Sequence, residues 1–116
     1  MDFQQTIIVG PTDTDSYNII HHPQYFIWIE KAIFEWLLSN YDNIEHSTYK
    51  IDKFQCKFLS PGNLYDRLTL YLRYKGKKIL HDGANMKFQT KIINQRTRSP
   101  IIEADFFVKL TGESYA

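Results

Sequence analysis

Cysteine, proline and glycine are scarce in this 116-residue chain, which has one, four and five of them, and no apolar run is long. Because Cys56 has no second cysteine to pair with, an internal disulfide is excluded. The most apolar window, residues 25–38, is shorter than the roughly 20 residues that cross a bilayer, and it contains three charged residues. The N-terminal residues MDFQQ lack the basic flank and apolar core of a signal peptide. We therefore predict a cytoplasmic protein with no membrane span.

The residues that are plentiful are those of an ordinary globular core. Apolar residues make up 43% of the chain, aromatic residues 16% and charged residues 23%. This balance disfavours disordered and collagen-like classes, and the length corresponds to about one domain. No internal repeat or low-complexity tract interrupts the sequence. We expect residues 1–116 to form a single domain.

The net charge of +1 conceals an uneven distribution along the chain. Residues 1–49 contain seven acidic side chains and a single lysine, whereas residues 50–116 contain thirteen basic and six acidic side chains. Such asymmetry indicates that the second half meets an anion. The phosphate groups of a small ligand, a nucleic acid and an acidic protein all remain candidates.

One helix is predicted among several strands. Proline is favoured at the first helical position, so the helix is predicted to begin at Pro23, and helical periodicity continues from there to about residue 39, where Asn40 can end it. Strands are predicted from β-branched and aromatic residues at 5–9, 49–59, 64–74, 79–93 and 101–110, and the last four are separated by SPGN, KGKK and NQRTRSP. Gly83, inside the segment 79–93, suggests a β-bulge.

The predicted helix is apolar on nearly every face. Its polar residues form one narrow stripe of Gln24, Glu30, Lys31 and Glu35, so we expect other structure to enclose the helix. We predict an α+β fold in which one central helix is wrapped by a curved antiparallel β-sheet, with the four later strands forming a meander. One sheet leaves its edges open, and a homodimer that joins two sheets edge to edge would close them.

The chain is most informative between residues 13 and 23. This segment, DTDSYNIIHHP, places two carboxylates and two imidazoles immediately before the helix. A helix N-terminus offers free N–H groups with a partial positive charge, and a nearby carboxylate can act as a base or nucleophile. The combination suits acyl transfer: Asp15 would attack a carbonyl or activate water, while the N–H groups near His22 would stabilise the oxyanion.

Other interpretations of the same segment exist. Asp and Asn before a helix commonly form turns or caps, and paired histidines are commonly polar surface. A calcium loop of the EF-hand type is excluded because Tyr17 and Asn18 occupy positions that need an Asp or Asn and a Gly. A zinc site is disfavoured because His21 and His22 are adjacent and diverge. We expect neither a metal nor a cofactor.

A longer pattern makes the acyl-transfer interpretation more specific. The stretch DTDSYNIIHHPQYFIWIEKAIFEWL resembles the D-T-D-x-x-G-v-v-x-x-x-x-Y-x-x-w-x-E-x-A-r-x-E-x-l signature of hotdog-fold acyl-CoA thioesterases, the group that includes 4-hydroxybenzoyl-CoA thioesterase. The stretch FLSPGNLYDRLTLYLRY resembles the second block of that family, in which a Pro loop leads through an Asp into a long strand. The likeness of pattern extends over residues 7–110. It implies a hotdog fold and hydrolysis of a thioester carried by coenzyme A or an acyl carrier protein.

The resemblance implies roles for individual residues. Asp15 falls on the family's catalytic carboxylate, which acts as general base or nucleophile. His22 falls on the residue whose backbone N–H polarises the thioester carbonyl, and in one branch this residue is itself a catalytic His. Asn18 stands where the family usually has Gly, and Asn tolerates the left-handed backbone conformation. We expect Asn18 and Tyr25 to contact the substrate, Tyr25 as part of an acyl pocket.

Basic residues in the second half have a related interpretation. Lys75, Lys77 and Lys78 follow a predicted strand, and the similar region in the aromatic-acyl branch of the family contributes basic side chains to the phosphates of coenzyme A. The resemblance therefore implies that these lysines bind the phosphates, although a run of charge also fits a solvated hairpin tip. Arg96 and Arg98 form a second, smaller basic patch.

The leading hypothesis is thus a thioester hydrolase whose sites are shared between subunits of a homodimer or homotetramer. The alternative is a non-catalytic acyl-CoA-binding or dimerisation module with the same fold. Nucleic-acid binding through RYKGKK and NQRTR has no recognised motif in its favour, and we expect no nucleic-acid partner. A dehydratase of the same fold is disfavoured because its H-x-x-x-x-P-x-x-P pattern does not follow His22.

Overall fold

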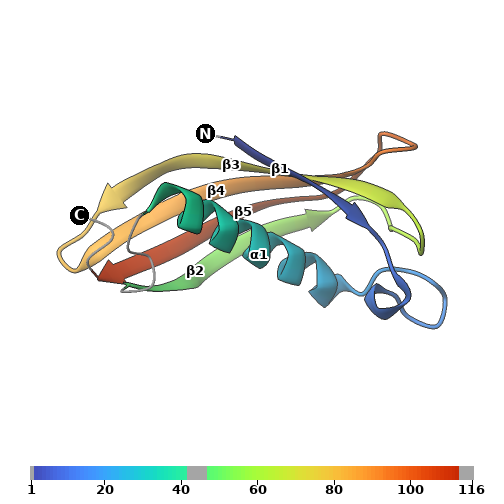
Figure 1. Cartoon of the computed structure of the whole chain (residues 1–116), viewed down its shortest axis with the longest axis horizontal. Helices are drawn as coiled ribbons and strands as arrows, with labels where there is room; N and C mark the ends of the chain where they lie inside the picture. The colour runs from blue at the N-terminus through green and yellow to red at the C-terminus, as the bar shows by residue number, and fades with distance from the viewer. Residues whose placement is uncertain (1, 42–46, 113–116) are drawn as a thin grey trace.

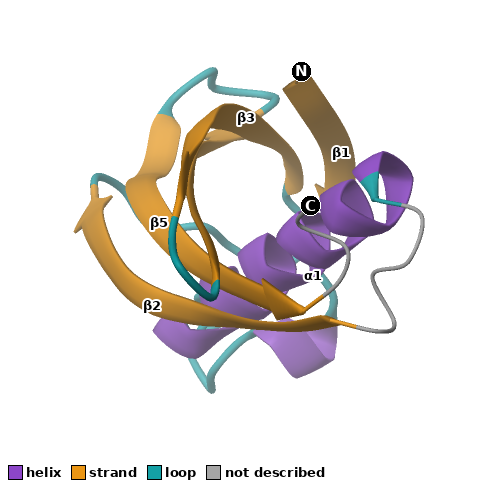
Figure 2. Ribbon diagram, turned by 90° about the vertical axis from the view of Figure 1, so that its left-hand side faces the viewer, coloured by secondary structure: helices purple, strands orange, loops and turns teal. Residues whose placement is uncertain are grey.

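A computed structural model describes residues 2–41 and 47–112 of the chain. The elements are β1 (Asp2–Ile8), a 3-10 turn η1 (Pro11–Asp13), α1 (His22–Asn40), β2 (Ser47–Phe58), β3 (Arg67–Ile79), β4 (Gly83–Asn94) and β5 (Pro100–Gly112). The five strands form one antiparallel sheet that curls around α1, which packs on its concave face (Figures 1 and 2). The predicted α+β architecture, with one helix wrapped by a curved antiparallel sheet, is confirmed.

The core lies between α1 and the concave face of the sheet. The helix buries one stripe with a period of 3.6 residues, made of Tyr25, Ile29, Ala32, Ile33, Trp36 and Leu37. The strands contribute every second residue, as period-two alternation requires, and on β3 these are Leu68, Leu70 and Leu72. Trp36 stacks on Tyr74 with ring centroids 4.7 Å apart, which joins the end of the helix to β3.

The opposite side of α1 is not enclosed by residues 2–41 and 47–112. Ile27, Phe34 and Leu38 are 56%, 40% and 49% exposed, with Glu30 and Lys31 between them. The expectation that other structure encloses the helix is therefore wrong for a single copy, because one sheet covers one side of a helix only. We refer to Ile27, Phe34 and Leu38 as the apolar stripe.

The order of the strands differs from the predicted meander. The sheet runs β1-β3-β4-β5-β2, so only β3, β4 and β5 are consecutive neighbours. Strand β2 pairs with β5 at one edge, and β1 pairs with β3 at the other. The segment 59–66 thus connects β2, at one edge of the sheet, to β3, which lies next to the opposite edge strand β1. The pairing of β2 with β5 is long-range, and alternation within each strand cannot predict it.

The predicted turn at KGKK is also wrong. Strand β3 continues through this tetrapeptide to Ile79. A bulge between Tyr74 and Lys77 contains Gly76, whose φ is +110°. The hairpin turn comes after Ile79, where the Leu80 N–H donates to the Gly83 carbonyl at 2.8 Å. Gly83 therefore begins β4 and does not form the bulge predicted there.

Within the two described segments, no helix is both long and apolar enough to cross a membrane. The cytoplasmic location stays a prediction.

Candidate active site at the start of the helix

The loop between β1 and α1 folds back on itself. The His21 N–H donates to the Asp13 carbonyl at 3.1 Å, and the Asp15 N–H donates to the Ile19 carbonyl at 2.9 Å. In this short antiparallel ladder, Asp15 lies two residues further along the chain than Asp13. Two residues of extended chain span about 7 Å, at 3.3–3.4 Å per residue. Asp15 therefore stands at the tip of the loop that leads directly into α1.

The two oxygens of the Asp15 carboxylate have different surroundings. Oδ1 accepts hydrogen bonds from the Tyr17 N–H at 2.8 Å and from the Ile19 N–H at 3.1 Å. Oδ2 has no hydrogen-bond partner among residues 2–41 and 47–112, and the side chain is half-buried. One oxygen holds the loop in shape, as in an Asx turn, and the other is available to a water molecule or a substrate.

Asn18 gives the loop its turn. Its φ is +63°, the left-handed region in which Gly and Asn are best tolerated. The prediction that Asn can preserve the shape usually made by Gly is confirmed. The Asn18 carbonyl accepts the Leu64 N–H at 2.9 Å, so the loop is also joined to the segment before β3.

Gly62 holds the same loop through a backbone hydrogen bond, a role that the sequence did not predict. Its carbonyl accepts the Ile20 N–H at 2.9 Å. A Cβ at this position would collide with Cδ1 of Ile20 and would lie 3.2 Å from the Tyr25 hydroxyl. A side chain at this position would force Cδ1 of Ile20, the end of a flexible side chain in the core, to shift. The Pro61-Gly62 dipeptide was the available signal.

The first turn of α1 has an open N–H group. His21 precedes the helix in an extended conformation and makes no side-chain cap, and Pro23 has no N–H to offer. In the described part of the chain, the His22 N–H has no acceptor, whereas the Gln24 N–H donates to the His21 carbonyl at 3.0 Å. The positive end of the helix and this free donor together form a site for a partly negative oxygen.

The His22 side chain lies on an aromatic platform. Its ring stacks on Phe58, the last residue of β2, with centroids 4.0 Å apart and an interplanar angle of 7°. Tyr25 lies beside both rings at 6.4 and 5.8 Å and is 2% exposed. Burial raises the pKa of Tyr25 to about 12, so this phenol stays neutral. In the single chain the Tyr25 ring belongs to the core, whereas Phe58, 38% exposed, reaches the surface. The contact of Tyr25 with substrate stays a prediction.

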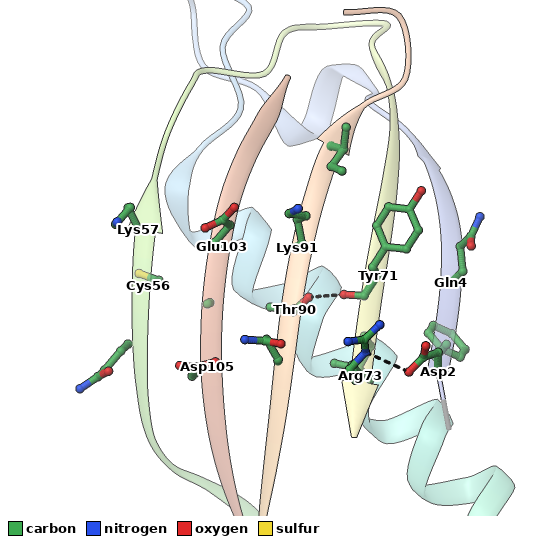
Figure 3. Close-up of a pocket in the computed structure, with 16 residues that line it drawn as sticks. Asp2, Gln4, Cys56, Lys57, Tyr71, Arg73, Thr90, Lys91, Glu103 and Asp105 are labelled. Carbon is green, nitrogen blue, oxygen red and sulfur yellow. Dashed lines mark hydrogen bonds and ion pairs between the residues drawn. The ribbon is translucent and has the colours of Figure 1, made fainter. Parts of the chain in front are cut away.

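Two prominent hollows in the described part of the structure lie away from both Asp15 and His22. The larger, about 940 Å³, is an open depression on the face of the sheet opposite α1 (Figure 3). It crosses all five strands and includes a row of paired residues, Gln4, Tyr71, Lys91, Glu103 and Lys57. The smaller, about 530 Å³, lies between α1 and β2. Tyr17, two residues after Asp15, is 81% exposed, so the Asp15 loop lies at the surface formed by the described residues.

The lysines predicted to bind phosphate lie at the opposite end of the molecule from Asp15 and His22. Nζ of Lys77 is 5.6 Å from the ring of Tyr41, which follows the last residue of α1, whereas His22 begins α1. A helix of 19 residues is about 28 Å long at 1.5 Å per residue. Figure 1 likewise shows the end of β3 and the loop before α1 at opposite ends of the molecule. Lys75, Lys77 and Lys78 therefore do not share a site with Asp15 of the same chain.

Known proteins resemble this chain in structure but not in sequence. No family model and no curated protein matches the sequence. Among solved structures, a 1,4-dihydroxy-2-naphthoyl-CoA thioesterase from Synechocystis is similar over 97% of this chain and 83% of its own, with a TM-score of 0.79 and 17% identity. A probable thioesterase from Bartonella henselae is similar over 100% and 93%, with a TM-score of 0.74 and 22% identity.

A third similar structure is a hypothetical thioesterase from Streptococcus pneumoniae solved with coenzyme A. The similarity covers 97% of this chain and 80% of the other, with a TM-score of 0.76 and 18% identity. At these identities the likenesses show the fold. The hotdog fold predicted from the sequence is confirmed.

Proposed function

We propose that this chain, which has the hotdog fold of the thioesterases it resembles, hydrolyses the thioester of an acyl-CoA or acyl carrier protein to a free acid and a thiol. The observation that carries the proposal is the pairing of a half-anchored carboxylate, Asp15, with an open helix N-terminus at His22 in one hydrogen-bonded loop. The fold alone is compatible with many activities, so the proposal depends on this loop.

In the proposed reaction the carbonyl oxygen of the thioester accepts a hydrogen bond from the His22 N–H. Asp15 then takes a proton from water, whose oxygen attacks the carbonyl carbon, or attacks that carbon itself to form an anhydride that water cleaves. In either route the C–S bond breaks and the thiolate leaves with the electron pair and is protonated. One well-placed N–H donor to the developing oxyanion contributes roughly 3–4 kcal/mol.

The open surroundings of Asp15 support sites that are shared between two subunits. Among the described strands, β2 pairs with β5 alone, and Phe54 and Phe58 on it are 49% and 38% exposed. Phe34 of the apolar stripe stacks on Tyr49 of β2, with ring centroids 6.1 Å apart, so the stripe adjoins this strand. We propose that a second copy covers the edge of β2 and the apolar stripe, in a homodimer or in a homotetramer built from such dimers, and that the acyl group lies between the copies, near Asn18 and Phe58.

The alternative function, a non-catalytic acyl-CoA-binding or dimerisation module, is favoured by one observation. Oδ1 of Asp15 already has a structural task, since it holds two N–H groups of its own loop. On this alternative the carboxylate shapes the loop and does no chemistry.

Thiol release separates the two functions. The purified chain is incubated with short-chain, long-chain and aromatic acyl-CoAs and with an acyl carrier protein thioester, and free thiol is followed with a chromogenic disulfide. We expect turnover well above the uncatalysed rate for at least one of these substrates. Stabilisation of the chain against heat by acyl-CoA without any thiol release would favour the binding module.

A further inference from the structure

Three connecting segments meet at the end of the molecule that holds the candidate active site. Figure 1 shows the loop before α1, the segment before β3 and the turn between β4 and β5 together at one end of the sheet. We name residues 62–66 the clamp segment, because its backbone is bonded to the loop before α1 at two points. The Gly62 carbonyl accepts the Ile20 N–H at 2.9 Å, and the Leu64 N–H donates to the Asn18 carbonyl at 2.9 Å.

Ile19, between these two points, is the direct support of the Asp15 carboxylate. The Ile19 carbonyl accepts the Asp15 N–H at 2.9 Å, and the Ile19 N–H donates to Oδ1 of Asp15 at 3.1 Å. Ile19 also pairs with Asn63 of the clamp segment in an isolated antiparallel β-bridge. The clamp segment therefore controls the position of Asp15 through one intervening residue.

The clamp segment has a backbone conformation that its own sequence does not favour. Tyr65 has a φ of +71°, in the left-handed region that a bulky residue rarely adopts. Its ring is 73% exposed, so the packing of this side chain gives little support. Strain of this kind persists only where the surrounding contacts hold it. The Tyr65 N–H donates to the Val9 carbonyl at 2.9 Å, and the next residue, Asp66, makes the further contacts.

Asp66 anchors the clamp segment to the sheet. Its Oδ2 accepts hydrogen bonds from the Asn63 N–H at 2.9 Å and from Nδ2 of Asn94 at 3.0 Å. Asn94, the last residue of β4, is 6% exposed, and its Oδ1 accepts the N–H groups of Arg96 at 3.0 Å and Thr97 at 3.3 Å. Because both ends of the Asn94 amide are bonded, its orientation is fixed. Asp66 thus has a rigid partner, and a bond to a charged acceptor is stronger than a neutral one.

We infer that Asp66, paired with Asn94, is a positioning residue for Asp15. The pair holds the clamp segment, and the clamp segment fixes the distance between Oδ2 of Asp15 and the His22 N–H. The inference rests on the proposed function for the reaction that this distance serves. Asp66 acts through the loop and takes no part in the proton transfer. Displacement of a reacting group by about 1 Å can lower a rate about 100-fold, so an anchor outside the site can have a large effect.

Two substitutions of Asp66 separate its hydrogen bonds from its charge. Asp66→Ala removes both hydrogen bonds, and kcat for thiol release should fall about 10- to 100-fold. KM should stay within about threefold, because the displaced carboxylate of Asp15 acts in the chemical step and not in substrate binding. Asp66→Asn keeps an oxygen that can accept both donors, so its kcat should stay within about threefold of the unaltered chain.

Asn94→Asp tests the pair from the other side. It places two carboxylates where an amide faced a carboxylate, and this like-charge contact should lower kcat about tenfold or more. Adding Asp66→Asn removes one of the two charges and returns an amide to the pair. In this double variant kcat should recover to within about threefold of the unaltered chain. Such a rescue identifies the contact as the cause, since two independent losses would add. A double variant slower than Asn94→Asp alone would overturn the inference.

Thr90→Val is the matched structural control. Thr90 lies on the same strand as Asn94, is 1% exposed, and donates through Oγ1 to the Tyr71 carbonyl at 2.9 Å. The change removes a buried hydrogen bond without touching the clamp segment, so kcat should stay within about twofold. All rates are measured well below the lowest melting temperature of the set, where every variant is folded. Equal losses of kcat in Thr90→Val and Asp66→Ala would overturn the inference, because lower stability alone would then explain both.

Hydrogen exchange keeps this inference separable from the proposed function, since it needs no hydrolysis. The N–H groups of Ile19 and Ile20 should exchange at least about tenfold faster in Asp66→Ala than in Thr90→Val, because the loop has lost its anchor. Equal exchange in the two variants would overturn the inference, and so would faster exchange with kcat unaltered. Faster exchange in a chain that releases no thiol would contradict the enzyme and leave the hold of Asp66 on the loop standing.

Discussion

The imidazole of His22 lies flat on the ring of Phe58, with centroids 4.0 Å apart and an interplanar angle of 7°. This contact joins the first residue of α1 to the last residue of β2, which are 36 positions apart in the sequence. It fixes the direction of the His22 ring at the point where the helix offers its free N–H group.

Replacing Phe58 by Leu tests this contact. The change should destabilise the chain by roughly 0.5–1.5 kcal/mol from the lost aromatic pair alone. The ring protons of His22 should lose the upfield ring-current shift that a stacked aromatic imposes, which a proton NMR spectrum reports directly. Phe54→Leu is the matched control, because Phe54 stacks on Phe106 and not on His22. Unmoved His22 resonances in the Phe58→Leu variant would contradict the stacking.

Glycine should matter more at position 62 than at position 10. A Cβ on Gly62 collides with Ile20 beneath the Asp15 loop, whereas a Cβ on Gly10 meets only Asp13 Oδ2 at an ordinary 3.6 Å. Overpacking of this kind costs about 1–3 kcal/mol. Urea denaturation should therefore show a clear loss for Gly62→Ala and a change within about 0.5 kcal/mol for Gly10→Ala. Equal midpoints for the two variants would show that the loop is not packed as described.

Tyr25 should make the chain sensitive to alkali. Its pKa is about 12 in the folded chain and 10.0 in a free tyrosine, so between these values the folded state holds a proton that the unfolded state has released. Stability should accordingly be full below pH 10 and fall as the pH rises toward 12, by about 1.4 kcal/mol per pH unit. In Tyr25→Phe this part of the decline should disappear from denaturation curves measured between about pH 9 and pH 12. An unchanged slope would place the titrating group elsewhere.

The proposed second copy can be tested at the apolar stripe. Ile27 on the stripe and Ile8 near the other edge of the sheet are similarly exposed, at 56% and 59%. Ile27→Glu should raise the dissociation constant of the dimer at least about tenfold, because a charge would be buried without a partner. Ile8→Glu should leave the dimer intact. Sedimentation velocity over a range of concentrations reports both. A chain that is monomeric at every concentration, or equal effects of the two variants, would contradict the proposed interface.

The local features of the fold were predictable and the long-range ones were not. Pro23 and the periodicity after it predicted α1 to within a residue or two because both signals lie within the helix. The place of β2 beside β5 depends on pairing between residues about 50 positions apart, which no local pattern records. Likewise KGKK contains the usual residues of a turn, yet a bulge at Gly76 lets β3 continue through it.

The same distinction applies to the candidate site. Asp15, Asn18 and His22 could be identified because they lie in one short segment whose spacing has chemical meaning. Phe58 could not, since it meets that segment only in three dimensions, and for Gly62 the Pro61-Gly62 dipeptide indicated a turn but not its contact with the loop. The assignment of phosphate binding to Lys75, Lys77 and Lys78 stays a prediction: residue type indicates charge, but the direction of β3 places these lysines at the opposite end of the molecule from Asp15 of the same chain.

The most direct test of the account is the rate of thiol release by Asp15→Asn beside that of Asp13→Asn. Each substitution keeps an oxygen that can accept the N–H groups now bound, those of Tyr17 and Ile19 for Asp15 and that of Gly10 for Asp13. Loop shape should therefore survive in both, while only Asp15→Asn loses the base or nucleophile. We predict that kcat falls at least about 100-fold in Asp15→Asn and stays within about twofold in Asp13→Asn. Full turnover by a folded Asp15→Asn chain would contradict the central claim.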